Sequence, residues 1–264
     1  MHIVTSKDGT SIAYDKQGEG QAIILVAGAL CARLSWSGPE LAKLLSPHFT
    51  VFNYDRRGRG DSGDTKPYAI EREIEDIEAL IDEAGETASL YGHSSGGALA
   101  MEAAIKLGGK SVKKLAMYEV PYNDDVNAQR AWREYIKKLT ELLAAERRGD
   151  AVALFMKYVG TPDEQIEGMR HAPFWQALEA IAPTLAYDHT AILGEDPSVP
   201  TEQAMQVLVP TLVMNGGASP SFMHETVQAL SKAIPHAQLR TLEGQTHDVA
   251  SEVLAPVLVD FFTG

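Results

Sequence analysis

The amino-acid sequence predicts an α/β fold, with a doubly wound, mostly parallel eight-stranded sheet, helices on both of its faces and an inserted helical cap. Strand-like and helix-like segments alternate along residues 22–118, which indicates parallel strands joined by crossover helices. Short runs of consecutive apolar residues, such as residues 22–26, are typical of strands buried on both faces. Residues 122–206 carry helix signals without a strand pattern, so we expect a core of residues 1–121 and 207–264 with a cap between them.

The predicted core elements follow from local patterns. The strands are short apolar or alternating segments bounded by turn residues. They span residues 2–5, 11–16, 22–26, 49–54, 88–91, 114–118, 210–214 and 237–242. The predicted core helices span residues 39–45, 70–84, 97–107, 222–234 and 251–262. In the second of these, Ile74, Ile77 and Ile81 recur at helical spacing, and Gly85 follows as a stop signal.

The predicted cap contains one long helix with an apolar face from Trp132 to Leu143, which we expect to end at Gly149. A second helix is predicted over residues 151–159, and prolines divide the rest of the cap into shorter pieces. Several aromatic and methionine side chains of the cap fit two roles equally well, as the lining of a substrate pocket or as packing of the cap on the core. They are Phe155, Met156, Met169, Phe174 and Trp175.

Composition narrows the choice of partners and compartment. The 264 residues carry a formal net charge of -13, which disfavours binding to nucleic acid or to anionic membranes. The N-terminus lacks a basic segment followed by an apolar run, and no stretch approaches the roughly 18 apolar residues of a membrane helix. The single cysteine, Cys31, cannot form an internal disulfide. We expect a cytoplasmic protein with a small-molecule partner, and the sequence is compatible with a homo-oligomer.

The most informative motif is Gly92-His93-Ser94-Ser95-Gly96, which lies between an apolar strand and an alanine-rich helix. The pattern G-x-S-x-G at a strand-to-helix turn is typical of a nucleophile elbow, where glycines relieve crowding and the serine hydroxyl is exposed. Ser94 is therefore the candidate nucleophile. Because His93 occupies an x position of the motif, we expect it to point away from the nucleophile and to have a structural role.

A serine nucleophile requires a base. A serine hydroxyl reacts weakly until a histidine removes its proton, and a carboxylate must orient that histidine. His247 is the candidate base, because it alone among the eight histidines lies in a loop after a C-terminal strand.

With these features, the sequence resembles the α/β-hydrolase fold family. Strand, nucleophile elbow, helical insertion, strand and histidine follow in the family's order over essentially the whole chain. The resemblance is strengthened by the loop Asp55-Arg56-Arg57-Gly58-Arg59-Gly60-Asp61-Ser62, which matches the D-x-R-G-x-G-x-S loop of many members. On the other interpretation, this loop is a glycine-rich turn with a solvated basic cluster.

The resemblance also implies a triad acid, which the family usually carries in the loop after the strand at residues 210–214. Here that loop reads Asn215-Gly216-Gly217-Ala218-Ser219-Pro220 and holds no carboxylate. Some members, lactone hydrolases among them, place the acid at the end of the preceding strand, where this chain has Glu119. The resemblance therefore implies a triad of Ser94, Glu119 and His247, in the chain order expected of this fold. Weaker alternatives are a Ser–His dyad or an acid at Asp124, Asp125 or Asp248.

An oxyanion hole made of backbone N–H groups would stabilise the negative charge that develops on the substrate. We expect one donor from Ser95, directly after the nucleophile. The resemblance implies that the other comes from the loop after the third strand, where many members have His-Gly followed by an apolar residue. Aligning Gly28 with that glycine makes Ala29 the donor. Ala27 stands where many members have the histidine. The alignment of this loop, and with it the choice of Ala29 as donor, is therefore open by one residue.

These residues predict a cofactor-free serine hydrolase of carboxylic esters or lactones that works through an acyl-enzyme. A thioesterase or C–C bond hydrolase would use the same triad, and a slow-turnover small-molecule binding or receptor protein would retain it. Epoxide hydrolases and haloalkane dehalogenases resembling this family need an aspartate nucleophile, so Ser94 argues against both. We expect no metal site, because no pair of histidines stands at ligand spacing.

Overall fold

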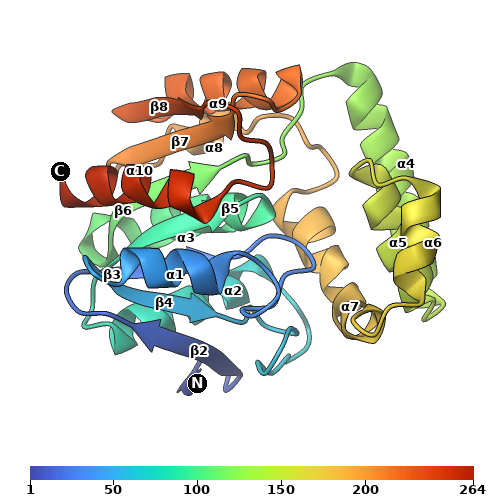
Figure 1. Ribbon diagram of the computed structural model, residues 1–264, viewed down its shortest axis with the longest axis horizontal. Helices are drawn as coiled ribbons and strands as arrows, with labels where there is room; N and C mark the ends of the chain where they lie inside the picture. The colour runs from blue at the N-terminus through green and yellow to red at the C-terminus, as the bar shows by residue number, and fades with distance from the viewer.

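The computed structural model describes residues 1–264 and contains one eight-stranded sheet with helices on both faces (Figure 1). The strands are β1 (His2–Thr5), β2 (Ser11–Gln17), β3 (Ala22–Val26), β4 (Thr50–Tyr54), β5 (Ala88–His93), β6 (Val112–Tyr118), β7 (Thr211–Gly216) and β8 (Ala237–Leu242). Their order in the sheet is β1-β2-β4-β3-β5-β6-β7-β8. Only β2 runs antiparallel to its neighbours, and all other pairs are parallel. The predicted fold class is confirmed.

The core helices cover the sheet on two sides. They are α1 (Gly38–Leu45), α2 (Ile70–Glu83), α3 (Ser95–Ser111), α9 (Ser221–Ala233) and α10 (Ser251–Thr263). α1 and α10 pack together in front of the sheet in Figure 1, and α2 and α3 pack together on the other face. Side chains of β3 alternate between two buried clusters, with Ile24 and Val26 in one and Ile23 and Leu25 in the other. Burial on both faces explains the uninterrupted apolar sequence of this strand.

The chain between β6 and β7 is helical. It contains α4 (Val126–Ala144), α5 (Arg148–Tyr158), α6 (Asp163–Arg170), α7 (Trp175–Ile181), the 3₁₀ helix η1 (Ala182–Thr184), the π-helix η2 (Tyr187–Ile192) and α8 (Thr201–Ala204). α4, α5, α6 and α7 form a group beyond the right-hand end of the sheet (Figure 1). The exact domain limits stay a prediction. No helix of the chain combines the length and apolar character that crossing a membrane requires.

The predicted end of the long cap helix is wrong. α4 ends at Ala144, and Gly149 lies inside α5. Glu146 makes the turn with a φ of 53°, and its N–H group donates to the carbonyl oxygen of Leu143. A non-glycine residue therefore holds the left-handed position that closes the helix. Gly149 instead lies close to α7: a Cβ there would be 2.3 Å from Oε1 of Glu179, and this flexible side chain would have to move.

Candidate active site

Ser94 occupies the turn between β5 and α3, with a φ of 57° and a ψ of -130°. Residues other than glycine rarely adopt this conformation. The flanking glycines are required by close backbone contacts: a Cβ on Gly92 would lie 2.5 Å from the carbonyl oxygen of Gly96, and one on Gly96 would lie 2.2 Å from that of Val26. The turn has the geometry of a nucleophile elbow. α3 begins at Ser95, so the Ser95 N–H group belongs to the first helical turn, where N–H groups have no partner within the helix.

Backbone strain gathers around this turn. Six residues other than glycine have positive φ angles, and three of them are Leu30, Ser94 and Glu119, at 52°, 57° and 49°. Each of the three lies in a segment that sequence analysis assigns to the candidate site. Such conformations persist only where the surrounding structure holds them, and they cluster at functional sites.

Glu119 and His247 lie in direct contact, as an orienting acid and a base require. Glu119 follows β6, and His247 lies in the loop after β8. Nδ1 of His247 is 2.9 Å from Oε2 of Glu119. Because a carboxylate only accepts, Nδ1 carries the proton in this contact, which leaves Nε2 of a neutral ring free to act as a base. The carboxylate is fully buried, whereas 43% of the His247 side chain is exposed.

The carboxylate-free loop after β7 binds the acid instead of supplying it. Oε1 of Glu119 accepts a hydrogen bond of 2.8 Å from the Gly216 N–H and a short one from the Ser219 hydroxyl. Burial alone would raise the pKa of Glu119, but the hydrogen bonds from His247, Ser219 and Gly216 outweigh it and lower that pKa below its usual range. Glu119 is therefore held as an anion.

The side chain of His93 hydrogen-bonds to the backbone of the candidate base. Nε2 of His93 lies 2.9 Å from the carbonyl oxygen of His247, and the two rings are 4.8 Å apart. Since the carbonyl can only accept, His93 donates this bond. Burial lowers the pKa of His93 to about 4, so the ring is neutral near pH 7. Ser94 is tied to the same region, because its N–H group donates to the carbonyl oxygen of Tyr118 at 2.9 Å.

The loop after β3 lies against the candidate nucleophile. A Cβ on Gly28 would be 3.0 Å from the Ser94 Cβ and 3.5 Å from its Oγ, so a larger residue here would crowd Ser94. The next residue is Ala29, whose N–H group donates to no other group of the protein. The loop that carries Ala29 and the start of α3 at Ser95 both adjoin Ser94, and the N–H groups of these two residues stay the predicted oxyanion donors.

With this geometry in place, comparison with known proteins identifies the family. A model of the Alpha/beta hydrolase family matches residues 23–257 of the chain. The chain belongs to this family.

This α/β hydrolase is similar to several solved structures and to a sequence relative. An α/β hydrolase from Sphaerobacter thermophilus DSM 20745 is 47% identical, with 99% of this chain and 100% of that chain covered and a TM-score of 0.86. The enol-lactonase from Burkholderia xenovorans LB400 is 23% identical, with both chains fully covered and a TM-score of 0.73, a likeness that shows the fold alone. The non-heme chloroperoxidase CPO-A1 of Kitasatospora aureofaciens is 24% identical over 95% of this chain and 93% of its own length.

The other carboxylates considered from the sequence have different contacts in the α/β hydrolase. Asp124 accepts a hydrogen bond of 2.9 Å from the Val199 N–H. Asp125 is the N-cap of α4 and accepts from two N–H groups of its first turn. Asp248 is exposed to solvent. Glu119 is thus the carboxylate in contact with His247.

The cap side chains singled out from the sequence mostly pack. Phe155, Met156 and Met169 are half-buried against the larger hydrophobic cluster. Trp175 is buried and its indole N–H donates to Glu179, whereas 51% of Phe174 is exposed. No three His, Cys, Asp or Glu side chains come together in a way that could hold a metal ion.

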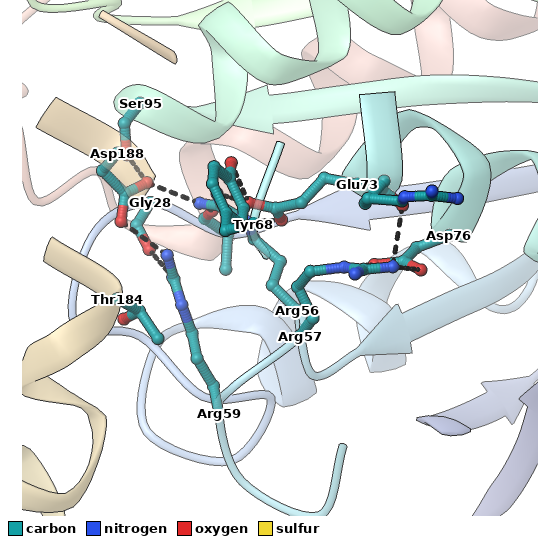
Figure 2. Close-up of polar contacts among 12 residues, drawn as sticks. Gly28, Arg56, Arg57, Arg59, Tyr68, Glu73, Asp76, Ser95, Thr184 and Asp188 are labelled. Carbon is teal, nitrogen blue, oxygen red and sulfur yellow. Dashed lines mark hydrogen bonds and ion pairs between the residues drawn. The ribbon is translucent and has the colours of Figure 1, made fainter. Parts of the chain in front are cut away.

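The arginines of the loop after β4 are fully buried, so the interpretation of this loop as a solvated basic cluster is wrong. Arg56, Arg57 and Arg59 are each at most 1% exposed, and each pairs with a carboxylate (Figure 2). Arg56 and Arg59 share Asp188, a cap residue that nothing in the local sequence marks out. Asp188 is thus a residue of the site that the sequence does not predict, as are Ser219 and Gly216 in their contacts with Glu119.

Proposed function

We propose that the protein is a cofactor-free serine hydrolase of carboxylic esters or lactones, with Ser94, His247 and Glu119 as its catalytic triad. Two observations carry the proposal: the 2.9 Å contact between Nδ1 of His247 and Glu119, and the elbow conformation of Ser94. This contact fixes the imidazole tautomer that a serine hydrolase needs. The enol-lactonase of Burkholderia xenovorans has the same fold, at an identity that supports nothing more specific.

The proposed reaction begins when Nε2 of His247 accepts the Ser94 hydroxyl proton as Oγ attacks the substrate carbonyl carbon. The carbonyl oxygen becomes an oxyanion, and the N–H groups of Ala29 and Ser95 donate to it. The anionic Glu119 stabilises the imidazolium through Nδ1–H. His247 then gives its proton to the departing alkoxide, which leaves an acyl group on Ser94 and releases an alcohol.

Water completes the cycle. Nε2 of His247 takes a proton from a water molecule, whose oxygen attacks the acyl carbon through a second oxyanion in the same hole. Collapse of this intermediate returns the proton to Ser94 and releases a carboxylic acid. An ester thus gives an acid and an alcohol, and a lactone gives one hydroxy acid.

A substrate panel tests the proposal. Aryl esters, lactones and thioesters are incubated with the protein, with Ser94→Ala and with Asp125→Asn, which changes a remote carboxylate to an amide. We expect turnover of an ester or a lactone that Ser94→Ala abolishes and that Asp125→Asn leaves unchanged. Turnover confined to thioesters, or turnover that survives Ser94→Ala, would contradict the proposal. A burst of product without steady turnover would indicate a slow-turnover binding protein instead.

A further inference from the structure

A buried polar network links the cap to the two segments that flank Ser94 (Figure 2). Its centre is Asp188, the second residue of the π-helix η2, whose side chain is fully buried. Oδ1 of Asp188 accepts hydrogen bonds from the Ser95 hydroxyl at 2.8 Å and from Nη1 of Arg56 at 2.7 Å. Oδ2 accepts from Nη2 of Arg59 at 2.5 Å. One cap carboxylate thus binds three side chains of the core.

The two arginines continue the network to the loop after β3. Nη1 of Arg59 donates to the carbonyl oxygen of Gly28 at 2.5 Å. Nη1 of Arg56 donates to the carbonyl oxygen of Ala27 at 3.1 Å. Asp188 therefore reaches both sides of the proposed oxyanion hole, Ser95 directly and the Ala27–Gly28 backbone through the arginines.

The contact with Gly28 controls the direction of the proposed Ala29 donor. The carbonyl of Gly28 and the N–H of Ala29 belong to one planar peptide group, so fixing the oxygen also fixes the line along which the N–H points. A guanidinium that binds the oxygen further polarises the peptide group and strengthens its N–H as a donor. Arg59 is held for this contact by Asp188, its one carboxylate partner.

The charges of the network balance only with the cap in place. Arg56 also forms a two-pronged pair with Glu73, through Nε and Nη2 at 2.7 Å each. The two arginines and the two carboxylates, Glu73 and Asp188, together carry no net charge. Burial alone would raise the pKa of Asp188, but Arg56 and Arg59 lower it to about 2, so the carboxylate is ionised.

Tyr187 holds η2 against the core, and a backbone bond on the other side of Asp188 closes the helical turn. The hydroxyl of Tyr187 donates to Oδ2 of Asp64 at 2.7 Å, and its ring stacks on that of Tyr68 at 3.8 Å. On the other side, the Leu193 N–H donates to the Asp188 carbonyl oxygen at 2.9 Å, the spacing of a π-helix. The cap therefore presents Asp188 in one fixed position.

We propose that Asp188 is a positioning residue, which sets the oxyanion hole from the cap by orienting Ser95 directly and the Gly28–Ala29 peptide through Arg59. The inference rests on the proposed function, because it takes the N–H groups of Ala29 and Ser95 as the oxyanion donors. Asp188 acts through these groups and does not touch the substrate.

The test uses Asp188→Asn and a matched control, Asp76→Asn. Asp76 is also a buried carboxylate, and it binds the neighbouring Arg57 at 2.7 and 2.8 Å, but neither residue of this pair hydrogen-bonds to Gly28 or Ser95 (Figure 2). Both variants lose a buried negative charge next to an arginine of the same loop. They differ in whether the lost charge reaches the oxyanion hole.

The readout is the rate at which a fluorophosphonate modifies Ser94, followed by intact-protein mass spectrometry. Oγ gives its proton to Nε2 of His247 as it forms a bond to phosphorus, fluoride leaves, and the phosphoryl oxygen occupies the oxyanion site. Misfolded protein lowers the fraction that can be modified, whereas a displaced oxyanion donor lowers the rate constant of the modifiable fraction. The two effects are therefore separate, and the assay needs no knowledge of the natural substrate.

We expect Asp188→Asn to slow modification by at least about tenfold, since loss of one oxyanion donor costs about a hundredfold or more elsewhere. Asp76→Asn should keep the rate constant of the native protein. With any ester that the native protein turns over, Asp188→Asn should lower kcat and leave KM nearly unchanged. Equal rate constants for Asp188→Asn and the native protein would overturn the proposal and leave the hydrolase assignment intact.

Ser95→Ala decides the question if Asp188→Asn does not fold. It removes only the hydroxyl that donates to Asp188 and keeps the Ser95 N–H, and we expect modification to slow by about threefold to tenfold. An unchanged rate in this folded variant would refute the direct orientation of Ser95 by Asp188, and with it the proposal that Asp188 acts on both sides of the oxyanion hole. Failure of the native protein to react at Ser94 at all would instead reject the proposed hydrolase, and the positioning role with it.

Discussion

Replacing Glu119 with glutamine is the most informative change to the proposed triad, because the new side chain has nearly the same shape. The carboxylate accepts three hydrogen bonds, from Nδ1 of His247 on Oε2 and from the Gly216 N–H and Ser219 hydroxyl on Oε1. A glutamine has one accepting oxygen and one donating NH₂ group. If its oxygen keeps the two donors of the β7 loop, the NH₂ group must face Nδ1 of His247.

Two donors cannot share a hydrogen bond, so the imidazole responds by moving its proton to Nε2. Nε2 is the nitrogen that must accept the Ser94 proton, and in this tautomer it cannot. Loss of the triad acid in another serine hydrolase lowers kcat by about 10⁴ through the same change of tautomer. This factor corresponds to about 5 kcal/mol of transition-state stabilisation, and we expect Glu119→Gln to lose a comparable amount.

The assay is steady-state hydrolysis of the best ester or lactone of the panel, with thermal unfolding as a check on folding. Ser219→Ala is the matched control, since it removes one donor to Oε1 and leaves the contact with His247. We expect it to cost no more than about tenfold in kcat. Asp124→Asn and Asp125→Asn should be nearly silent, because an amide oxygen can still accept the backbone bonds that these carboxylates receive. A folded Glu119→Gln with kcat within tenfold of the native value would refute the reasoning.

Three further outcomes follow from the structure. Ser94→Ala should fold normally and abolish turnover, and Ser94→Ala combined with His247→Ala should be little worse, because triad members act as a unit; kcat measurements on the single and double variants check this. Hydrolysis should survive strong chelators, and activity lost in chelator and restored by zinc would contradict the metal-free chemistry. Burial lowers the pKa of His189 to about 4 from its ordinary 6.5, so the unfolded chain binds more protons between these pH values. Between pH 6.5 and pH 4, the free energy of unfolding of the native protein should fall by about 3 kcal/mol more than that of His189→Gln, as measured by urea unfolding. Equal falls in both proteins would contradict this role of His189.

The elements best predicted from the sequence are those set by local contacts. The elbow at Ser94 depends on glycines at Gly92 and Gly96, two residues to either side, so its geometry is written in one short motif. The sheet likewise follows from short apolar segments and the turns between them. The end of α4 was less predictable, because Glu146 replaces the glycine that usually closes a helix.

The rest of the candidate site depends on contacts between distant parts of the chain. His93 is next to Ser94 in the sequence, but its partner is the carbonyl of His247, 154 positions away. Asp188 lies 129 positions from Arg59 and 132 from Arg56. A single aspartate in a helical segment gives no sign of such partners. Only the burial of the arginines shows that the loop after β4 needed carboxylates from elsewhere.

Trapping the acyl-enzyme tests the central claim most directly. The protein is mixed with an aryl ester that it hydrolyses, quenched in acid during the burst, and digested for peptide mass spectrometry. A serine hydrolase of the proposed kind carries the acyl group of the substrate on Ser94, and Ser94→Ala carries none. Turnover without any acylated Ser94, or an acyl group on another residue, would contradict the proposed mechanism.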